Sequence, residues 1–207
     1  MNPGPTHLVE YGEPEQQLRS EVWEVLRLRA AMDRAAAIAD PVERSRQLLV
    51  LVRSGDMVGG TFSSLSALRK LAAGGEAEAN ALVSLLSDET LLGWHQDIIQ
   101  ALAGKPVADS QFGNFLSEET KYWAVACRTL KPGWWNDMSS PKIELSRNHY
   151  SRAHALLEAI RVRKLSEPIP EVERFAVVWS GCPASEKDAE KDQIAEELNL
   201  LGASATR

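Results

Sequence analysis

The residues best suited to contacting a partner lie in one irregular segment. Trp134 and Trp135 are adjacent within KPGWWNDMSSPKIE, a stretch that has two prolines, a glycine and no helical period. Adjacent tryptophans in a loop cannot easily both face one core, and tryptophan is enriched at interface hot spots. The segment predicts an exposed partner contact at these two residues. The alternative is that one or both of them fill a gap between helices.

A second candidate is the basic stretch 142–164, which holds six Lys and Arg and two Glu, a net charge of +4 in an acidic chain. We expect Arg147, Arg152 and Arg161 to contribute to a binding surface for an acidic partner or a nucleic-acid backbone. The alternative is a solvated face that pairs with the acidic C-terminal helix.

The residues that could act as catalysts or metal ligands form no recognised catalytic pattern. His149 and His154 are five positions apart, which suits one helix face less well than a spacing of four. The chain has no His-Glu-x-x-His, no Cys-x-x-Cys, no Gly-rich phosphate loop and no Gly-x-Ser-x-Gly elbow. The sequence therefore predicts no metal site and no cofactor, and it gives no support for an enzyme.

The two cysteines do not make a disulfide framework. Cys127 lies in an apolar helical pattern and predicts a buried small hydrophobe. Cys182 predicts a turn residue just before a helix, where a thiol can have a lowered pKa. Because the N-terminus lacks a signal-peptide pattern and no apolar run approaches membrane-spanning length, we expect a cytoplasmic location without membrane contact.

The elements that must position these residues are helical. Residues 1–14 predict a mobile tail, and residues 15–165 predict a helical repeat domain in which Pro41 is the first residue of a helix. The helical spacing predicts burial of these residues: Trp23, Leu26, Leu49, Leu68, Leu82, Leu86, Ile98, Leu102, Leu116, Val125 and Leu157.

The middle of the chain contains a sequence repeat. Residues 70–90 align without a gap over residues 100–120, so that Leu-Ser-acid-Glu-Thr occurs twice at a spacing of thirty, and Leu-Ser occurs again at 145–146. Serine before an apolar-periodic run is a good N-cap, and acids suit the first turn of a helix. We therefore expect Ser87, Ser117 and Ser146 to begin helices, and Gly104 to end one.

This pattern resembles the short HEAT-type repeats of α-solenoids, the class also found in phycobilisome-lyase-like proteins. The stretch Leu86–Gly104 carries the resemblance, Leu116–Gly133 less fully, and the whole extends from about Thr61 to Lys164. The chain lacks the arginine usual in the middle of the first helix. The resemblance implies an all-α fold of stacked antiparallel helices, with the second helices lining a concave face, and it implies no particular activity.

Residues 166–207 predict a proline-rich linker and a C-terminal helix. The apolar run 174–180 reads as a single β-like stretch, although residues 171–179 suit a helix equally well after Pro168 and Pro170. Read as a strand before a loop and helix, it is similar to the opening unit of TIR-like signalling domains.

The predicted function is a protein-interaction module, an adaptor or scaffold whose partner is another protein. A HEAT-like protein that binds nucleic acid is an alternative, which the net charge of −6 and the pI near 5.3 disfavour. The sensor or adaptor part of a longer signalling or effector protein is another, and an enzyme or a lyase-like chaperone for a bound cofactor is a third.

Overall fold

The computed structural model describes residues 33–56, 75–131, 134, 140–182 and 192–203, together with single positions between 23 and 31. The regular elements in these ranges are helices, which confirms the predicted all-α class. The chain divides into two compact units, Met1–Ser64 and Leu65–Arg207. Among the helices that the structure describes, none is long and apolar enough to cross a membrane.

The first unit contains α2 (Pro41–Asp56), which begins at the predicted proline. The Asp40 carboxylate accepts the Glu43 N–H at 2.7 Å and so caps the first turn. Leu49 is buried as predicted, but Trp23 and Leu26 are exposed, and their predicted burial is wrong. Helical spacing shows which side of a helix is apolar, but it does not show whether another element covers that side.

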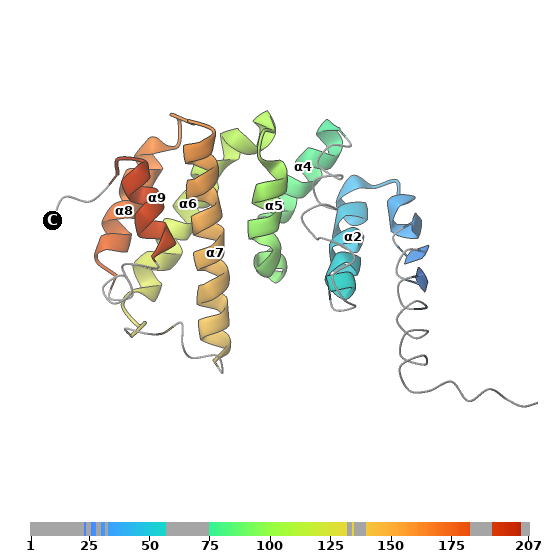
Figure 1. Ribbon diagram of the computed structural model, residues 1–207, viewed down its shortest axis with the longest axis horizontal. Helices are drawn as coiled ribbons and strands as arrows, with labels where there is room; N and C mark the ends of the chain where they lie inside the picture. Colours follow the sequence, from blue (N-terminus) through green and yellow to red (C-terminus); the bar gives the residue numbers. More distant parts are fainter. Residues whose placement is uncertain are drawn as a thin grey trace, which may run out of the picture. The chain divides into compact units, whose positions relative to one another are not determined.

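The second unit consists of helices that contact one another in alternation. Helix α6 packs against α4 and α8, whereas α7 packs against α5 and α9 (Figure 1). The two rows are joined where α4 contacts α5, α6 contacts α7 and α8 contacts α9. The bounds are α4 (Glu76–Leu85), the 3₁₀ helix η1 (Glu89–Trp94), α5 (His95–Leu102), α6 (Pro106–Ala126), α7 (Pro141–Val162), α8 (Ile169–Ser180) and α9 (Gln193–Leu200).

Prolines, and not the repeated serines, begin the long helices. Pro106 and Pro141 occupy the first turns of α6 and α7, so Ser117 and Ser146 lie inside continuous helices. Ser146 Oγ donates to the Lys142 carbonyl four residues earlier at 3.0 Å, as serine does within a helix. The first copy differs, because α4 ends there and Asp88 caps η1. The predicted helix starts at Ser87, Ser117 and Ser146 are therefore wrong.

The predicted end of a helix at Gly104 agrees with the structure. Helix α5 ends at Leu102, and Gly104 follows with a φ of +97°, a conformation that residues with a side chain rarely adopt. The predicted stop at this glycine is therefore confirmed.

The run 174–180 is helical. It lies within α8, which begins just after Pro168, so the β-like prediction is wrong and the helical alternative is confirmed. Helix α8 buries Val172, Phe175, Ala176 and Trp179, residues that recur at the helical period. Because α8 packs along α6, residues 169–180 do not form a linker.

An aromatic cluster packs between α6 and α8. The ring of Trp123 on α6 meets the ring of Trp179 edge-on, with 4.9 Å between centroids, and lies 6.0 Å from the ring of Trp134. The Trp179 indole N–H donates to Asp192 at 3.0 Å, and the other Asp192 oxygen accepts the Ala195 N–H. Asp192 therefore fixes the start of α9 against α8.

Six of the residues predicted to be buried are buried in this unit, which confirms the prediction for them: Leu82, Leu86, Ile98, Leu102, Leu116 and Leu157. Val125 is exposed, and its prediction is wrong. The buried stripe of α6 runs through Leu116, Glu119 and Trp123, and Val125 lies two residues beyond it, on another side of the helix. Leu68 falls outside the described residues.

A disulfide joins Cys127 to Cys182. Cys127 is the residue after α6, and Cys182 lies two residues beyond the end of α8. The bond corrects the expectation of an unpaired hydrophobe and an unpaired turn residue. It arises because α6 and α8 pack together, which brings their C-terminal ends close despite a separation of 55 in the sequence.

Reduction of this disulfide is expected to lower the free energy of unfolding by about 4 kcal/mol, because a cross-link over a loop of this length restricts the unfolded chain. Urea unfolding with and without a phosphine reductant measures the difference. The Cys127→Ala/Cys182→Ala variant is the control, and its stability should be insensitive to reductant. Equal stability of oxidised and reduced wild-type protein would contradict the expectation.

Candidate functional site

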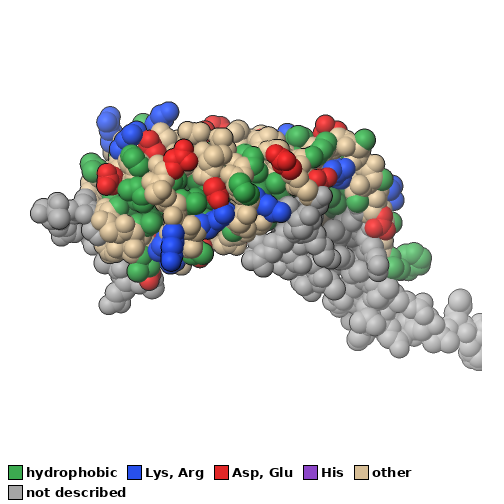
Figure 2. Space-filling view, turned by 90° about the horizontal axis from the view of Figure 1, so that it is seen from above, with side chains coloured by type: hydrophobic (Ala, Val, Ile, Leu, Met, Phe, Trp, Pro, Cys, Tyr) green, Lys and Arg blue, Asp and Glu red, His purple; other side chains and the backbone are tan. Residues whose placement is uncertain are grey.

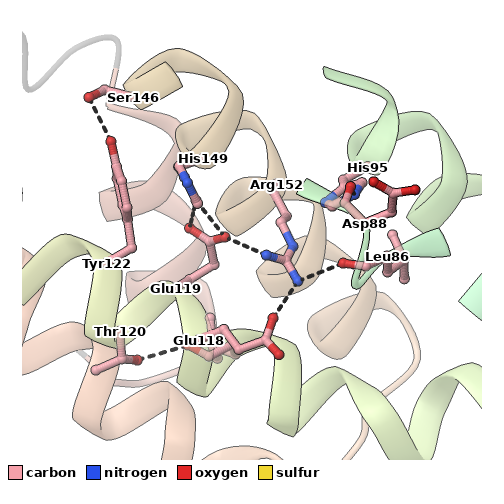
Figure 3. A network of polar contacts seen from close by, with 11 residues as sticks. Leu86, Asp88, His95, Glu118, Glu119, Thr120, Tyr122, Ser146, His149 and Arg152 are labelled. Carbon is pink, nitrogen blue, oxygen red and sulfur yellow. Dashed lines mark hydrogen bonds and ion pairs between the residues drawn. The ribbon is translucent and has the colours of Figure 1, made fainter. Parts of the chain in front are cut away.

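A buried arginine joins three segments of the second unit. Arg152 projects from α7 and donates to the Leu86 carbonyl at 3.1 Å, to Glu118 at 2.7 Å and to Glu119 at 3.1 Å (Figure 3). Leu86 is the residue after α4, and both glutamates lie on α6. The guanidinium group also lies 5.3 Å from the centre of the Phe115 ring. One side chain therefore connects α4, α6 and α7.

Glu119 receives a second donor from α7. Its fully buried carboxylate lies 3.0 and 3.2 Å from His149 Nδ1. Because a carboxylate only accepts, Nδ1 carries the hydrogen, and in the neutral ring Nε2 carries the lone pair. Arg152 and His149 together satisfy a carboxylate that would otherwise be costly to bury.

A tyrosine holds the histidine ring in place. Tyr122 stacks on His149 with 3.5 Å between ring centroids, and its hydroxyl lies 2.8 Å from Ser146 Oγ (Figure 3). Since Ser146 gives its own hydrogen to the Lys142 carbonyl, the tyrosine hydroxyl donates to Ser146. Burial raises the pKa of Tyr122, which keeps the hydroxyl in its donating form.

His95 lies next to this network and is neutral. Its Nε2–H donates to the Asp88 carbonyl at 3.2 Å, and the residue is buried. Burial, and then the positive charge of Arg152, lower the pKa of His95 to about 4. The positive charge of Arg152 therefore disfavours a second positive charge on His95 beside it.

The two repeated pentapeptides meet at this site. Leu86 and Asp88 of the first copy supply carbonyls to Arg152 and His95, whereas Glu118 and Glu119 of the second copy supply carboxylates to Arg152. The copies are spatial neighbours that bind one arginine. They occupy different local structures, a helix end and a helix interior.

The predicted site residues do not come together on one surface. Trp134 is only 4% exposed, so the predicted exposed contact is wrong there and the gap-filling alternative holds, while Trp135 lies outside the described residues. Arg152 is buried, and Arg161 forms a two-pronged ion pair with Glu197 on α9. Arg147 lies on α7 and is partly exposed.

Sequence reasoning missed five members of the network as site residues: Glu118, Glu119, Tyr122, Ser146 and His149. A signal for one of them existed. Glu119 lies three residues after Leu116 and four before Trp123, inside an otherwise apolar stripe. A carboxylate in that position requires a buried partner, and Arg152 occupies a matching position among the buried residues of α7.

The network is built to hold helices together. A carboxylate that orients a histidine is also part of many general bases, but such a base needs a nucleophile or substrate within reach. Here the Ser146 hydroxyl is already bonded to Tyr122 and Lys142. The described residues contain no group of three or more His, Cys, Asp and Glu arranged to hold a metal ion.

Comparison with known proteins does not assign this site. No protein-family model, no curated protein and no solved structure matches the chain.

The Arg152→Met variant is expected to lose about 3 to 5 kcal/mol of stability, because it leaves the Glu119 carboxylate buried without its cation. Adding Glu119→Gln should recover part of this loss. Chemical unfolding of both single variants and the double variant measures the coupling. Arg174→Met is the control, since Arg174 pairs with Glu171 at the surface, and it should cost less than about 1 kcal/mol. Equal losses in the two arginine variants would contradict a special role for Arg152.

Stability is expected to fall as the pH drops from 6.5 to 4. In this window His95 binds a proton in the unfolded chain, where its pKa is about 6.5, and stays neutral in the folded protein, where it is about 4. The unfolded state binds more protons, so acid favours it, by up to about 3 kcal/mol in total. The His95→Gln variant keeps a donor for the Asp88 carbonyl and should lose this part of the pH dependence. Parallel pH–stability curves for the two proteins would show that His95 does not cause it.

Proposed function

We propose that this chain is a protein-interaction module and that its binding face is the groove between α5 and α7. The groove has a volume of ≈ 290 Å³. Ile99 on α5 and Ala103 just after it line one side, and Ala155, Ala159 and Val162 line it from α7. This combination of a small-residue floor and a polar rim, made by Gln100, Glu158 and Arg163, is the observation that carries the proposal.

The groove suits an amphipathic helix of another protein. Alanines at positions 103, 155 and 159 allow a partner backbone or a medium-sized apolar side chain to approach closely, which is how helices bind in apolar grooves. Val162 stands at the edge with 62% of its surface exposed, so burying it would add to the binding free energy. Glu158 on the rim favours a basic residue beside the apolar stripe of that partner helix.

The alternation of the helices supports a solenoid-like arrangement of the kind that the HEAT resemblance implies. The successive pairs are α4 with α5, α6 with α7, and α8 with α9, and neighbouring pairs contact each other through α4 with α6, α5 with α7, α6 with α8 and α7 with α9. Helices α5 and α7 are the second members of their pairs. The resemblance assigns second helices to the concave, partner-binding face, and the groove lies between two of them.

The basic residues in and just after α7 give no support to nucleic-acid binding as the function. Arg152, Arg161 and Arg163 form ion pairs with acidic residues of α6 or α9. The face drawn in Figure 2 shows acidic, basic and apolar side chains interspersed, without a continuous basic field. A phosphate backbone needs such a field, because the affinity comes from neutralising several charges at once.

Site-specific photo-crosslinking tests the proposal and identifies the partner. A benzophenone amino acid replaces Val162, and a second protein carries the same group at Val177 on α8. In a lysate of the native host, we expect a protein to be captured from position 162 and not from position 177. Capture from position 177 alone would move the binding face to α8 and contradict the proposal.

The Val162→Glu variant is expected to weaken binding of the captured partner at least tenfold, about 1.4 kcal/mol, because it places a charge against the apolar floor. Val177→Glu is the matched control, since Val177 is 67% exposed and also helical. Its Kd should stay within about twofold of wild type. Calorimetric titration of both folded variants measures the difference, and equal Kd values for the two variants would show that the groove does not bind.

A further inference from the structure

Each cysteine of the Cys127–Cys182 disulfide lies one helical turn after a tryptophan of the aromatic cluster. The Cys127 N–H donates to the Trp123 carbonyl, and the Cys182 N–H donates to the Trp179 carbonyl, each at 3.0 Å. The rings of these two tryptophans are packed edge to face against each other. Packing that does not depend on the disulfide therefore keeps the two cysteines adjacent, so the bond can open and close again within a folded protein.

The two sulfur-bearing residues differ in access. A surface hollow of ≈ 490 Å³ is lined by Ala124, Cys127 and Arg128 from the end of α6 and by Val178 and Gly181 from the end of α8. Cys127 lines this hollow and is 8% exposed, whereas Cys182 does not line it and is 1% exposed. A nucleophile that enters the hollow therefore reaches the cystine from the Cys127 side.

We propose that Cys127 is a site of reversible S-thiolation, at which a small thiol that carries carboxylate groups attacks the disulfide through this hollow. Arg128 is an exposed cation on the wall of the hollow. Its positive charge attracts the carboxylates of the thiol and its attacking thiolate. A glutathione-like peptide has these groups in one molecule.

The exchange balances as a two-electron reduction. The thiolate sulfur forms a bond to Cys127 Sγ, the cystine bond breaks, and its electron pair leaves on Cys182 Sγ, which takes a proton from water. A second thiolate then attacks the external sulfur of the mixed disulfide and releases Cys127, which is protonated in turn. Two small thiols are oxidised to their disulfide, and the protein gains two thiol groups.

Peptide mapping of the folded, oxidised protein tests which sulfur is attacked. The protein is treated with glutathione, quenched with acid, alkylated and digested. We expect the mixed disulfide on the peptide that contains Cys127, and a reduced protein that keeps its helical circular dichroism. The bond should re-form when reduced glutathione is replaced by its disulfide, which accepts the two electrons and returns to two thiols. An adduct on Cys182, no adduct without denaturant, or unfolding on reduction would overturn the proposal.

A charge reversal tests the role of Arg128. Arg128→Glu should lower the second-order rate of reduction by glutathione about fivefold at low salt, with a smaller effect as salt is added. Reduction by cysteamine, which has no carboxylate, should change far less. The control is Lys105→Glu, which changes the net charge equally but lies at the other end of α6, about 35 Å along the helix. Equal slowing by the two variants would show that the hollow does not recruit a carboxylate.

Discussion

The buried pairing of Arg152 with Glu119 is the constraint on which the second unit depends. Neither charge is stable in an apolar core without the other, so α6 and α7 are fixed in the one register that brings them together. The same guanidinium binds the Leu86 carbonyl, which ties the end of α4 to this register. The cost of leaving any of these groups unpaired makes the arrangement specific as well as stable.

The other end of the unit is organised by aromatic packing. Trp123 lies one turn beyond Glu119 on α6 and packs against Trp134 and Trp179. The polar network and the aromatic cluster are therefore adjacent along the same helix. This cluster positions α8, and through Asp192 it also positions α9. The disulfide lies just beyond it and adds a covalent link to ends that already pack together.

Both proposed sites lie away from the buried polar network. The charged and aromatic residues that attract attention in the sequence, Arg152, Arg161 and Trp134, are used within the fold. The proposed binding groove is lined by alanines, an isoleucine and a valine instead. The proposed exchange site depends on an access route, a property of the surface and not of the cysteine itself.

The sequence by itself determined the all-α class, the helix start at Pro41, the stop at Gly104 and most of the core positions, because these follow from local backbone chemistry and periodicity. It did not determine what the serines do, since a serine can cap a helix or bond within one, and a proline several residues earlier decides between them. Only the tertiary structure decided that the repeated pentapeptides share one arginine and that the cysteines pair. The two cysteines are 55 positions apart in the sequence, and Leu86 and Arg152 are 66 apart. Contacts between residues so far apart are set by the packing of helices and not by spacing along the chain.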